Sequence, residues 1–250
     1  MVKSFIIFAA ISFALPLSAQ PKAKPPVPKL ANGKPDLSGV WDHPFVIDMS
    51  QTSRNDNCGA QLRGCSYQGP AEPIQMTAWG AEWFKTYKPE DFDATAHCNP
   101  MGYTRSRNAP VPTQIVATPT QVVFLHESMF AFHVVYLDGR PHPGDDARQT
   151  TWYGHSTGRW DGDTLVIETT GIRDDMWLDI QGSPITESAH VTERLKRVNF
   201  GLMQIEIAVD DPKAYTKPWS VTIEMALQVD TQMLEEICLD NEKDTKLYKK

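Results

Sequence analysis

Glu193 is the carboxylate whose place in the sequence most favours acid–base chemistry. In an alternating segment, Val191 and Leu195 mark an apolar face, and Glu193 falls between them. A carboxylate on an apolar face has a raised pKa unless a cation pairs with it, and such a group is a candidate general acid or base. The alternative is a structural one, a buried salt bridge with a residue such as Arg140 or Arg159.

Histidines add candidate proton carriers near the predicted strands. His126 and His133 each share a strand face with apolar residues, so both can point into a cavity. We expect His126 and His155 to move protons, and His133 and His190 to contact a ligand. No H-x-H or H-E-x-x-H spacing indicates a metal site, so a metal ion bound by several strands is left open. Each histidine also has a structural alternative, as a hydrogen-bonded or solvent-facing side chain.

The segment Gly154–Gly158 matches G-x-S-x-G, the pattern around the nucleophile of many serine hydrolases. That chemistry requires a strand, a sharp turn that exposes Ser156, and a following helix. The residues after Gly158 predict a hairpin instead. We therefore interpret the two glycines as part of a bulge in a bent strand.

Aromatic and cationic side chains around these candidates would complete a ligand pocket. Trp152 and Tyr153 precede His155 and are predicted to contact the ligand. Trp177 lies in a polar loop between strands, where it would either contact a ligand or plug one end of a barrel. Arg140 lies in a turn held between prolines, where it would stabilise developing negative charge at the rim of the site. An ordinary hairpin connection is the alternative for that turn.

The element that positions several of these residues is a predicted β-hairpin over 150–171, with its turn at Asp161-Gly162. Further strands are predicted at 114–119, 121–127, 130–137, 189–198, 203–209 and 219–227. So many strands with few helices favour a mainly β fold, an antiparallel lipocalin-like β-barrel. A β-sandwich is the alternative.

One short helix and long N-terminal loops are expected to accompany the barrel. Apolar residues at helical spacing predict the helix over 76–87, with Thr77 as its cap, although Gly80 weakens the pattern. The turn-rich stretch 48–70 predicts a long surface loop. The four cysteines suggest two disulfides, for which we favour Cys58–Cys65 and Cys98–Cys238 among three possible connectivities. A zinc site is the alternative.

The N-terminus predicts export. Residues 1–19 combine Lys3, an apolar run and a small-residue cleavage site, as a secretory signal peptide does. A Pro-rich linker over 20–36 and a single domain over 37–250 follow. The mature chain is therefore expected to be periplasmic or secreted, without a transmembrane segment. The net charge of −7 argues against a nucleic-acid partner.

Several longer strings resemble a known group of proteins. YLDGRPHP, WYGHSTGRWDGDTLVIETTG, WLD, SAHVTERL and DDPKAYTKPW together resemble a widespread group of exported bacterial proteins, over about residues 98–240. That group has no settled biochemical role, so the resemblance implies kinship and export rather than an activity. Separately, Gly39-Val40-Trp41 is similar to the G-x-W that opens many lipocalins.

These features favour a barrel with a pocket for a small, partly apolar molecule. The first hypothesis is a lyase, isomerase or hydrolase in which Glu193, His126 or His155 moves a proton. No organic cofactor is predicted, because no glycine-rich nucleotide loop occurs. The second hypothesis is a periplasmic carrier with the same pocket and no turnover, and the third is an interaction module of the cell envelope. The ligand and the oligomeric state stay open.

Overall fold

The computed structural model describes residues 25–52, 54–55, 66–86, 88, 93–144 and 149–238 of the 250-residue chain. The predicted signal peptide, both cysteines of the predicted Cys58–Cys65 disulfide and the end of the predicted helix at Tyr87 lie outside these residues. None of the helices in the described ranges has the length and apolar character needed to span a bilayer.

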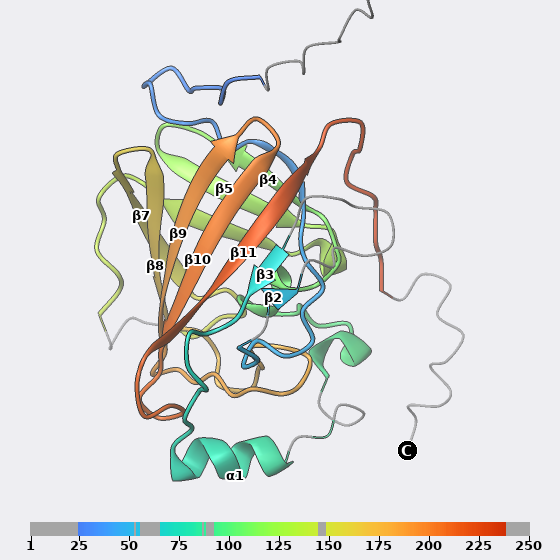
Figure 1. Ribbon diagram of the computed structural model, residues 1–250, viewed down its shortest axis with the longest axis vertical. Helices are drawn as coiled ribbons and strands as arrows, with labels where there is room; N and C mark the ends of the chain where they lie inside the picture. Colours follow the sequence, from blue (N-terminus) through green and yellow to red (C-terminus); the bar gives the residue numbers. More distant parts are fainter. Residues whose placement is uncertain are drawn as a thin grey trace, which may run out of the picture.

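Nine strands in the described part of the chain close into a β-barrel (Figure 1). In barrel order they are β1 (Gly39–Asp42), β4 (Thr113–Ala117), β5 (Gln121–His126), β6 (Phe132–Tyr136), β7 (His155–Asp161), β8 (Thr164–Thr170), β9 (His190–Asn199), β10 (Leu202–Asp210) and β11 (Trp219–Gln228). Pairing of β1 with β11 completes the closure. The lipocalin-like barrel is therefore confirmed, and the β-sandwich alternative is wrong.

Two short strands branch from the barrel. They are β2 (Arg54–Asn55) and β3 (Ser66–Gln68), and β3 continues the sheet along β11 beside the β1 contact. Part of the predicted surface loop over 48–70 is thus pinned to the barrel wall. Within the same loop, the Tyr67 hydroxyl donates a hydrogen bond to the Met49 carbonyl at 2.5 Å.

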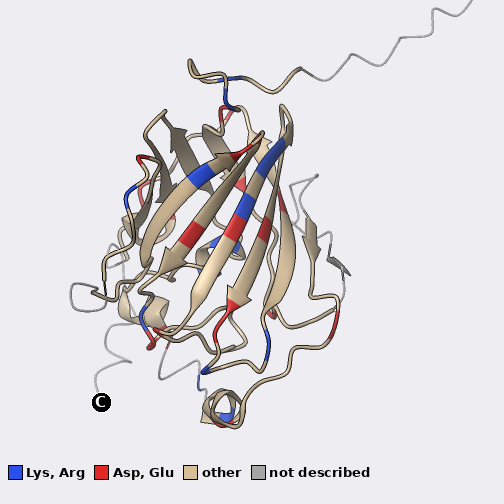
Figure 2. Ribbon diagram, turned by 90° about the vertical axis from the view of Figure 1, so that its left-hand side faces the viewer, with Lys and Arg blue, Asp and Glu red and all other residues tan. Residues whose placement is uncertain are grey.

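The barrel interior follows from strict alternation along the strands. In β10 the side chains of Met203, Ile205, Ile207 and Val209 are fully buried, because every second residue of a strand points to the same face. Each such burial stabilises the fold by about 1.5–3 kcal/mol. Charged residues are spaced along the same strands in Figure 2, and those that alternate outward, such as Glu206, are exposed.

The junction of β6 and β7 is the weakest part of the barrel wall. These neighbours run parallel and pair at two positions, Val135 with Ser156 and Tyr136 with Thr157. Every other neighbouring pair in the barrel is antiparallel and extends over three or more positions. The first half of β6 therefore separates from the segment that leads into β7.

The predicted hairpin over 150–171 exists as β7 and β8, with its turn one residue later than predicted. Asp161 pairs with Thr164, so that Gly162 and Asp163 form the turn, and Gly162 has the positive φ of 60° that such a turn requires. Strand β7 continues past Ser156 to Asp161 and leads into β8, so the described residues have no helix directly after Ser156, as expected from the sequence. The nucleophile-elbow interpretation therefore fails on its structural context.

The predicted helix is α1 (Ala78–Thr86), the only α-helix in the described residues, which lies below one end of the barrel (Figure 1). Thr77 caps it as predicted, because its hydroxyl accepts a hydrogen bond from the Gly80 amide at 3.1 Å. Gly80 allows close packing: a Cβ added there would lie 2.3 Å from the Ala214 carbonyl oxygen. Three 3₁₀ helices complete the set: η1 (Ala94–His97), η2 (Arg105–Arg107) and η3 (Ser128–Phe130).

The predicted disulfide between Cys98 and Cys238 is confirmed. It ties the segment after β11 to η1, across a sequence separation of 140 residues. Two hydrogen bonds hold the same C-terminal segment beside η3: the Leu234 amide donates to Glu127 at 2.8 Å, and the Met129 amide donates to Glu236 at 3.1 Å.

Candidate functional site

An internal segment around η2 contributes two large polar groups to the barrel interior. Tyr103 and Arg107 are almost completely buried there. Thr104 and Asn108 anchor the segment, because both side chains donate to the Leu178 carbonyl, at 3.1 and 3.2 Å. The segment thus places a phenol and a guanidinium among the apolar side chains of the wall.

Glu193 meets both of these groups. Its Oε1 accepts a hydrogen bond from Arg107 Nε at 2.9 Å, and its Oε2 accepts one from the Tyr103 hydroxyl at 2.7 Å. Both side chains of the ion pair are out of reach of solvent, at 1% and 0% exposure. The sequence correctly indicated a buried carboxylate, but both predicted partners, Arg140 and Arg159, are wrong.

Hydrogen bonds continue from Tyr103 across the barrel. Thr169 Oγ1 donates to the Tyr103 hydroxyl at 3.0 Å, and Ser156 Oγ lies 2.6 Å from Thr169 Oγ1. Ser156 Oγ also lies 2.6 Å from His133 Nε2. We call this series of groups, from His133 through Ser156, Thr169 and Tyr103 to Glu193, the polar chain. All five side chains are buried.

Because each hydroxyl has a single proton, the donor and the acceptor of every hydrogen bond in the polar chain can be assigned. Tyr103 donates its only hydroxyl proton to Glu193, so it must accept the hydrogen bond that Thr169 donates. Ser156 must then donate to Thr169, because the single hydroxyl proton of Thr169 is already used. It follows that His133 carries its proton on Nε2 and donates to Ser156. Its other nitrogen, Nδ1, is an acceptor without a hydrogen-bond partner in the described part of the protein.

Three buried histidines share this interior. Burial lowers the pKa of His126 and of His133 well below the usual range, and nearby Arg107 lowers both further. Burial and Arg107 lower the pKa of His43 to about 3. Each ring uses one nitrogen for a hydrogen bond and leaves the other without a partner among the described residues. All three are therefore neutral at physiological pH.

The barrel wall opens toward the polar chain at the β6–β7 junction. A pocket of about 490 Å³ lies between β6 and residues 151–156, and we call it the side pocket. Its lining includes Phe130, Phe132, Trp152, Tyr153, His133 and Ser156. The side chains of Phe130 and Phe132 are 52% and 65% exposed, as expected for the rim of an apolar opening. His133 and Ser156, the first two groups of the polar chain, belong to this lining, although only 2% and 1% of their surfaces are exposed.

The side pocket brings together four of the predicted site residues. The predicted ligand contacts Trp152, Tyr153 and His133 line it, and so does the predicted proton carrier His155. Tyr153 also stacks on His126, with ring centroids 5.1 Å apart, and its hydroxyl lies 3.1 Å from that of Ser106. The predicted proton carrier His126 therefore lies behind the pocket lining, within the barrel.

His155 lies at the edge of the side pocket and pairs with a second histidine. Its Nδ1 is 3.0 Å from Nδ1 of His142, and both rings are half-buried. Partial burial and the neighbouring ring lower the pKa of His155, so the two rings share one hydrogen bond in their neutral forms. No group of three or more His, Cys, Asp or Glu side chains in the described ranges is arranged to hold a metal ion.

Three predicted site residues belong neither to the polar chain nor to the lining of the side pocket. Arg140 is exposed, pairs with Asp138 and stacks at 3.8 Å over Tyr136, which lines the side pocket, but it does not contact Glu193. His190 is exposed on the outside of β9. Trp177 is 5% exposed and forms an isolated β-bridge with Pro184 in the segment between β8 and β9.

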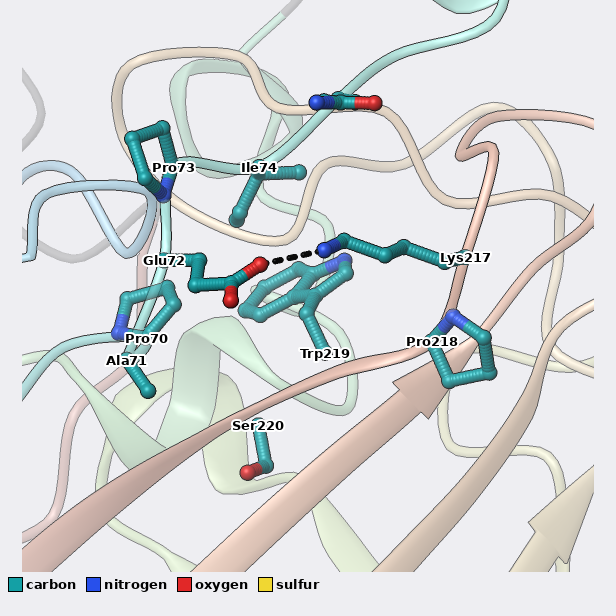
Figure 3. Close-up of a pocket in the computed structure, with 10 residues that line it drawn as sticks. Pro70, Ala71, Glu72, Pro73, Ile74, Lys217, Pro218, Trp219 and Ser220 are labelled. Atoms are coloured by element: carbon teal, nitrogen blue, oxygen red, sulfur yellow. Dashed lines mark hydrogen bonds and ion pairs between the residues drawn. The ribbon is translucent and has the colours of Figure 1, made fainter.

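A second pocket, of about 250 Å³, lies against the start of β11 (Figure 3). Trp219 forms its floor, and the Glu72–Lys217 ion pair crosses above the indole. Both charged side chains are more than half exposed, and none of the lining residues belongs to the polar chain. This second pocket therefore lies apart from the polar chain.

Tyr103, Arg107 and Thr169 belong to the site but were not predicted from the sequence. Arg107 was noticeable only as part of a small basic cluster in an irregular segment. Comparisons of the chain with protein-family models, with curated proteins and with solved structures find no match. The geometry of the barrel interior therefore carries the functional argument.

Proposed function

We propose that this barrel binds a small, partly apolar molecule in the side pocket, with a polar group of that molecule directed at His133 and Ser156. The single observation that supports this most strongly is the position of the pocket. It connects exposed aromatic side chains at the surface to the first groups of a buried polar chain. Ligand pockets commonly combine an apolar lining with a few polar groups that fix orientation.

The lining indicates which part of the ligand would contact which residues. Phe130, Phe132 and Trp152 offer apolar surface to a ring or short hydrocarbon body. His133 Nδ1 is buried and has no partner among the described residues, so a hydroxyl or amine donor that reaches it would find a free lone pair, because the other nitrogen already donates to Ser156. The ligand that fits this pattern has an apolar body and one hydrogen-bond donor.

An extracytoplasmic location is part of the proposal. The Cys98–Cys238 disulfide supports it, because disulfides persist mainly in oxidising compartments. The signal-peptide pattern of residues 1–19 supports it independently. A periplasmic or secreted protein with this pocket would act either as a carrier or as an enzyme.

Binding of the neutral fluorescent probe N-phenyl-1-naphthylamine tests the proposal. Phe132→Ala is expected to weaken probe binding about fivefold, the factor for roughly 1 kcal/mol of lost apolar contact. The matched control is Val198→Ala, since Val198 is also a strongly exposed apolar strand residue but does not line the pocket. Equal effects of the two substitutions, or no probe binding, would contradict the proposal. In a separate experiment, native mass spectrometry of the purified protein would identify a ligand that stays bound.

A further inference from the structure

We infer that the polar chain is a proton path, along which a weakly acidic ligand in the side pocket loses its proton to Glu193. This inference rests on the proposed function, because the ligand must first occupy the side pocket. It adds a reaction, which is proton abstraction, and a substrate class. It also assigns roles to Ser156, Thr169 and Tyr103.

Each residue between the ligand and Glu193 gains one proton and loses one, so no proton is left over. The ligand gives its proton to His133 Nδ1, and His133 releases the proton on Nε2 to Ser156. Ser156 passes its own hydroxyl proton to Thr169, and Thr169 passes its proton to Tyr103. Tyr103 finally protonates the Glu193 carboxylate across 2.7 Å. The products are a ligand anion, a neutral His133 of the opposite tautomer and a neutral Glu193.

Arg107 keeps the charge balanced during this transfer. Before the reaction its guanidinium is neutralised by Glu193. Once Glu193 is protonated, the same positive charge can stabilise the ligand anion, and Arg107 Nη1 is a buried donor without a partner in the described residues. The lowered pKa of His133 is consistent with this role, since a ring that cannot hold a second proton passes one onward.

The chemistry defines the substrate class. A neutral imidazole with a relay behind it abstracts protons from weak acids, and Arg107 stabilises the resulting charge. The apolar rim formed by Phe130 and Phe132 favours an aromatic or hydrocarbon body. The substrate is therefore a phenol, or a carbonyl compound with an acidic C–H that forms an enolate. Isomerisation and elimination reactions begin with this step.

Nucleophilic attack by Ser156 is the competing reaction for the same residues. It requires His133 Nε2 to accept the proton of Ser156. The order of donors in the polar chain is the reverse, because Ser156 donates to Thr169 and accepts from His133. Proton transfer is therefore the chemistry that this arrangement supports.

The experiment uses 4-nitrophenol with the full mature chain, because this probe is a weak acid whose absorption shifts to longer wavelength on ionisation. The pH is set below the ionisation range of the free probe. Wild-type protein is expected to bind the probe and ionise it, with the infrared carbonyl band of a protonated carboxylic acid appearing at the same time. Glu193→Gln is expected to remove that band.

Two substitutions break the chain outside the pocket lining. Thr169→Val and Tyr103→Phe are expected to leave probe binding within twofold of wild type and to reduce ionisation of the bound probe about tenfold, equal to one pKa unit. The matched control is Thr170→Val: Thr170 is the next residue of β8, and its hydroxyl has no partner among the described residues. This control is expected to ionise the probe as wild type does.

The outcomes separate the two proposals. If 4-nitrophenol binds but is not ionised, or if Thr169→Val ionises it as well as Thr170→Val does, the proton path is overturned and the proposed binding function stands. If neither 4-nitrophenol nor the neutral naphthylamine probe binds, both proposals are overturned. Nitrogen-15 NMR of the histidines gives a ligand-free check, in which His133 is expected to carry its proton on Nε2 in wild type and on Nδ1 in Thr169→Val.

Discussion

Arg107 reaches Glu193 from a segment that is not part of the barrel wall, and the two residues are 86 positions apart in the chain. Their ion pair, with Nε and Oε1 2.9 Å apart, ties the internal segment to β9. Arg107 also lies over the ring of Phe124, 4.0 Å from its centroid. The pair therefore has a structural role in addition to the chemistry proposed for it.

Removing the cation of this pair should be costly. Arg107→Met leaves the Glu193 carboxylate buried without a counter-charge, and it is expected to lower the free energy of unfolding by about 3–5 kcal/mol. The double variant Arg107→Met with Glu193→Gln is expected to recover part of this loss, because no unpaired charge is then buried. Urea denaturation followed by tryptophan fluorescence measures both values.

Arg159→Met is the control for that prediction. Arg159 is one of the two partners suggested from the sequence, but it lies 3.9 Å from Glu168 on the barrel surface, and its side chain is 66% exposed. Its loss is expected to change the free energy of unfolding by about 0–1 kcal/mol. A larger loss for Arg159→Met than for Arg107→Met would contradict the assignment of the buried pair.

The strands were predictable because successive side chains of a strand point to opposite faces of the sheet. Alternation placed Glu193 on the inward face from Val191 and Leu195 alone, and the structure confirms this position. His133 was placed in the same way. The parallel β6–β7 junction was not predictable, because nothing in the local alternation encodes which neighbour a strand pairs with.

The internal segment around η2 was not predictable as part of the site. Its residues have no apolar periodicity, so the sequence pattern predicts neither a helix nor a strand there. Burial of Arg107 and Tyr103 depends on partners that β8 and β9 supply only after the barrel closes. The correct partner of Glu193 therefore could not be chosen among the arginines from sequence spacing.

The protein is expected to lose stability steeply in acid. His43, His126 and His133 are neutral when folded but accept protons in the unfolded chain below their ordinary pKa of 6.5. The unfolded state therefore binds more protons, and stability falls as the pH decreases below 6.5. Three such groups give a slope of up to about 4 kcal/mol per pH unit. Urea denaturation at a series of pH values measures the slope.

Substituting one histidine at a time shows how much each ring contributes to the slope of the free energy of unfolding against pH. His126→Gln is expected to reduce it by about one third, because one of the three buried rings no longer takes up a proton on unfolding. His190→Gln serves as the control, since His190 is exposed on the outside of β9, and it is expected to leave the slope unchanged. An unchanged slope in His126→Gln would mean that this ring is not a source of the acid sensitivity.

The Cys98–Cys238 disulfide is expected to stabilise the fold by about 2–4 kcal/mol, because it restricts the unfolded chain over a long loop. The double variant Cys98→Ser with Cys238→Ser should show this loss in urea denaturation. Each single variant should show a similar loss, since either one removes the bond. Full stability in the double variant would mean that the hydrogen bonds of Leu234 and Met129 hold the C-terminal segment without the disulfide.

Gly80→Ala tests why a glycine lies inside α1. Intrinsic helix propensity alone predicts a gain of about 1 kcal/mol. The added Cβ would lie 2.3 Å from the Ala214 carbonyl oxygen, so α1 would have to move away from the loop that it contacts. We therefore expect Gly80→Ala to lower the free energy of unfolding by about 1–3 kcal/mol. The fluorescence of Trp79 and Trp83, whose rings stack 5.5 Å apart on this helix, should change as well.

Glu82→Ala is the control, because Glu82 is at an exposed position of the same helix, and its free energy of unfolding should stay within about 0.5 kcal/mol of wild type. A stabilising Gly80→Ala would show that the contact with Ala214 does not fix the position of the helix.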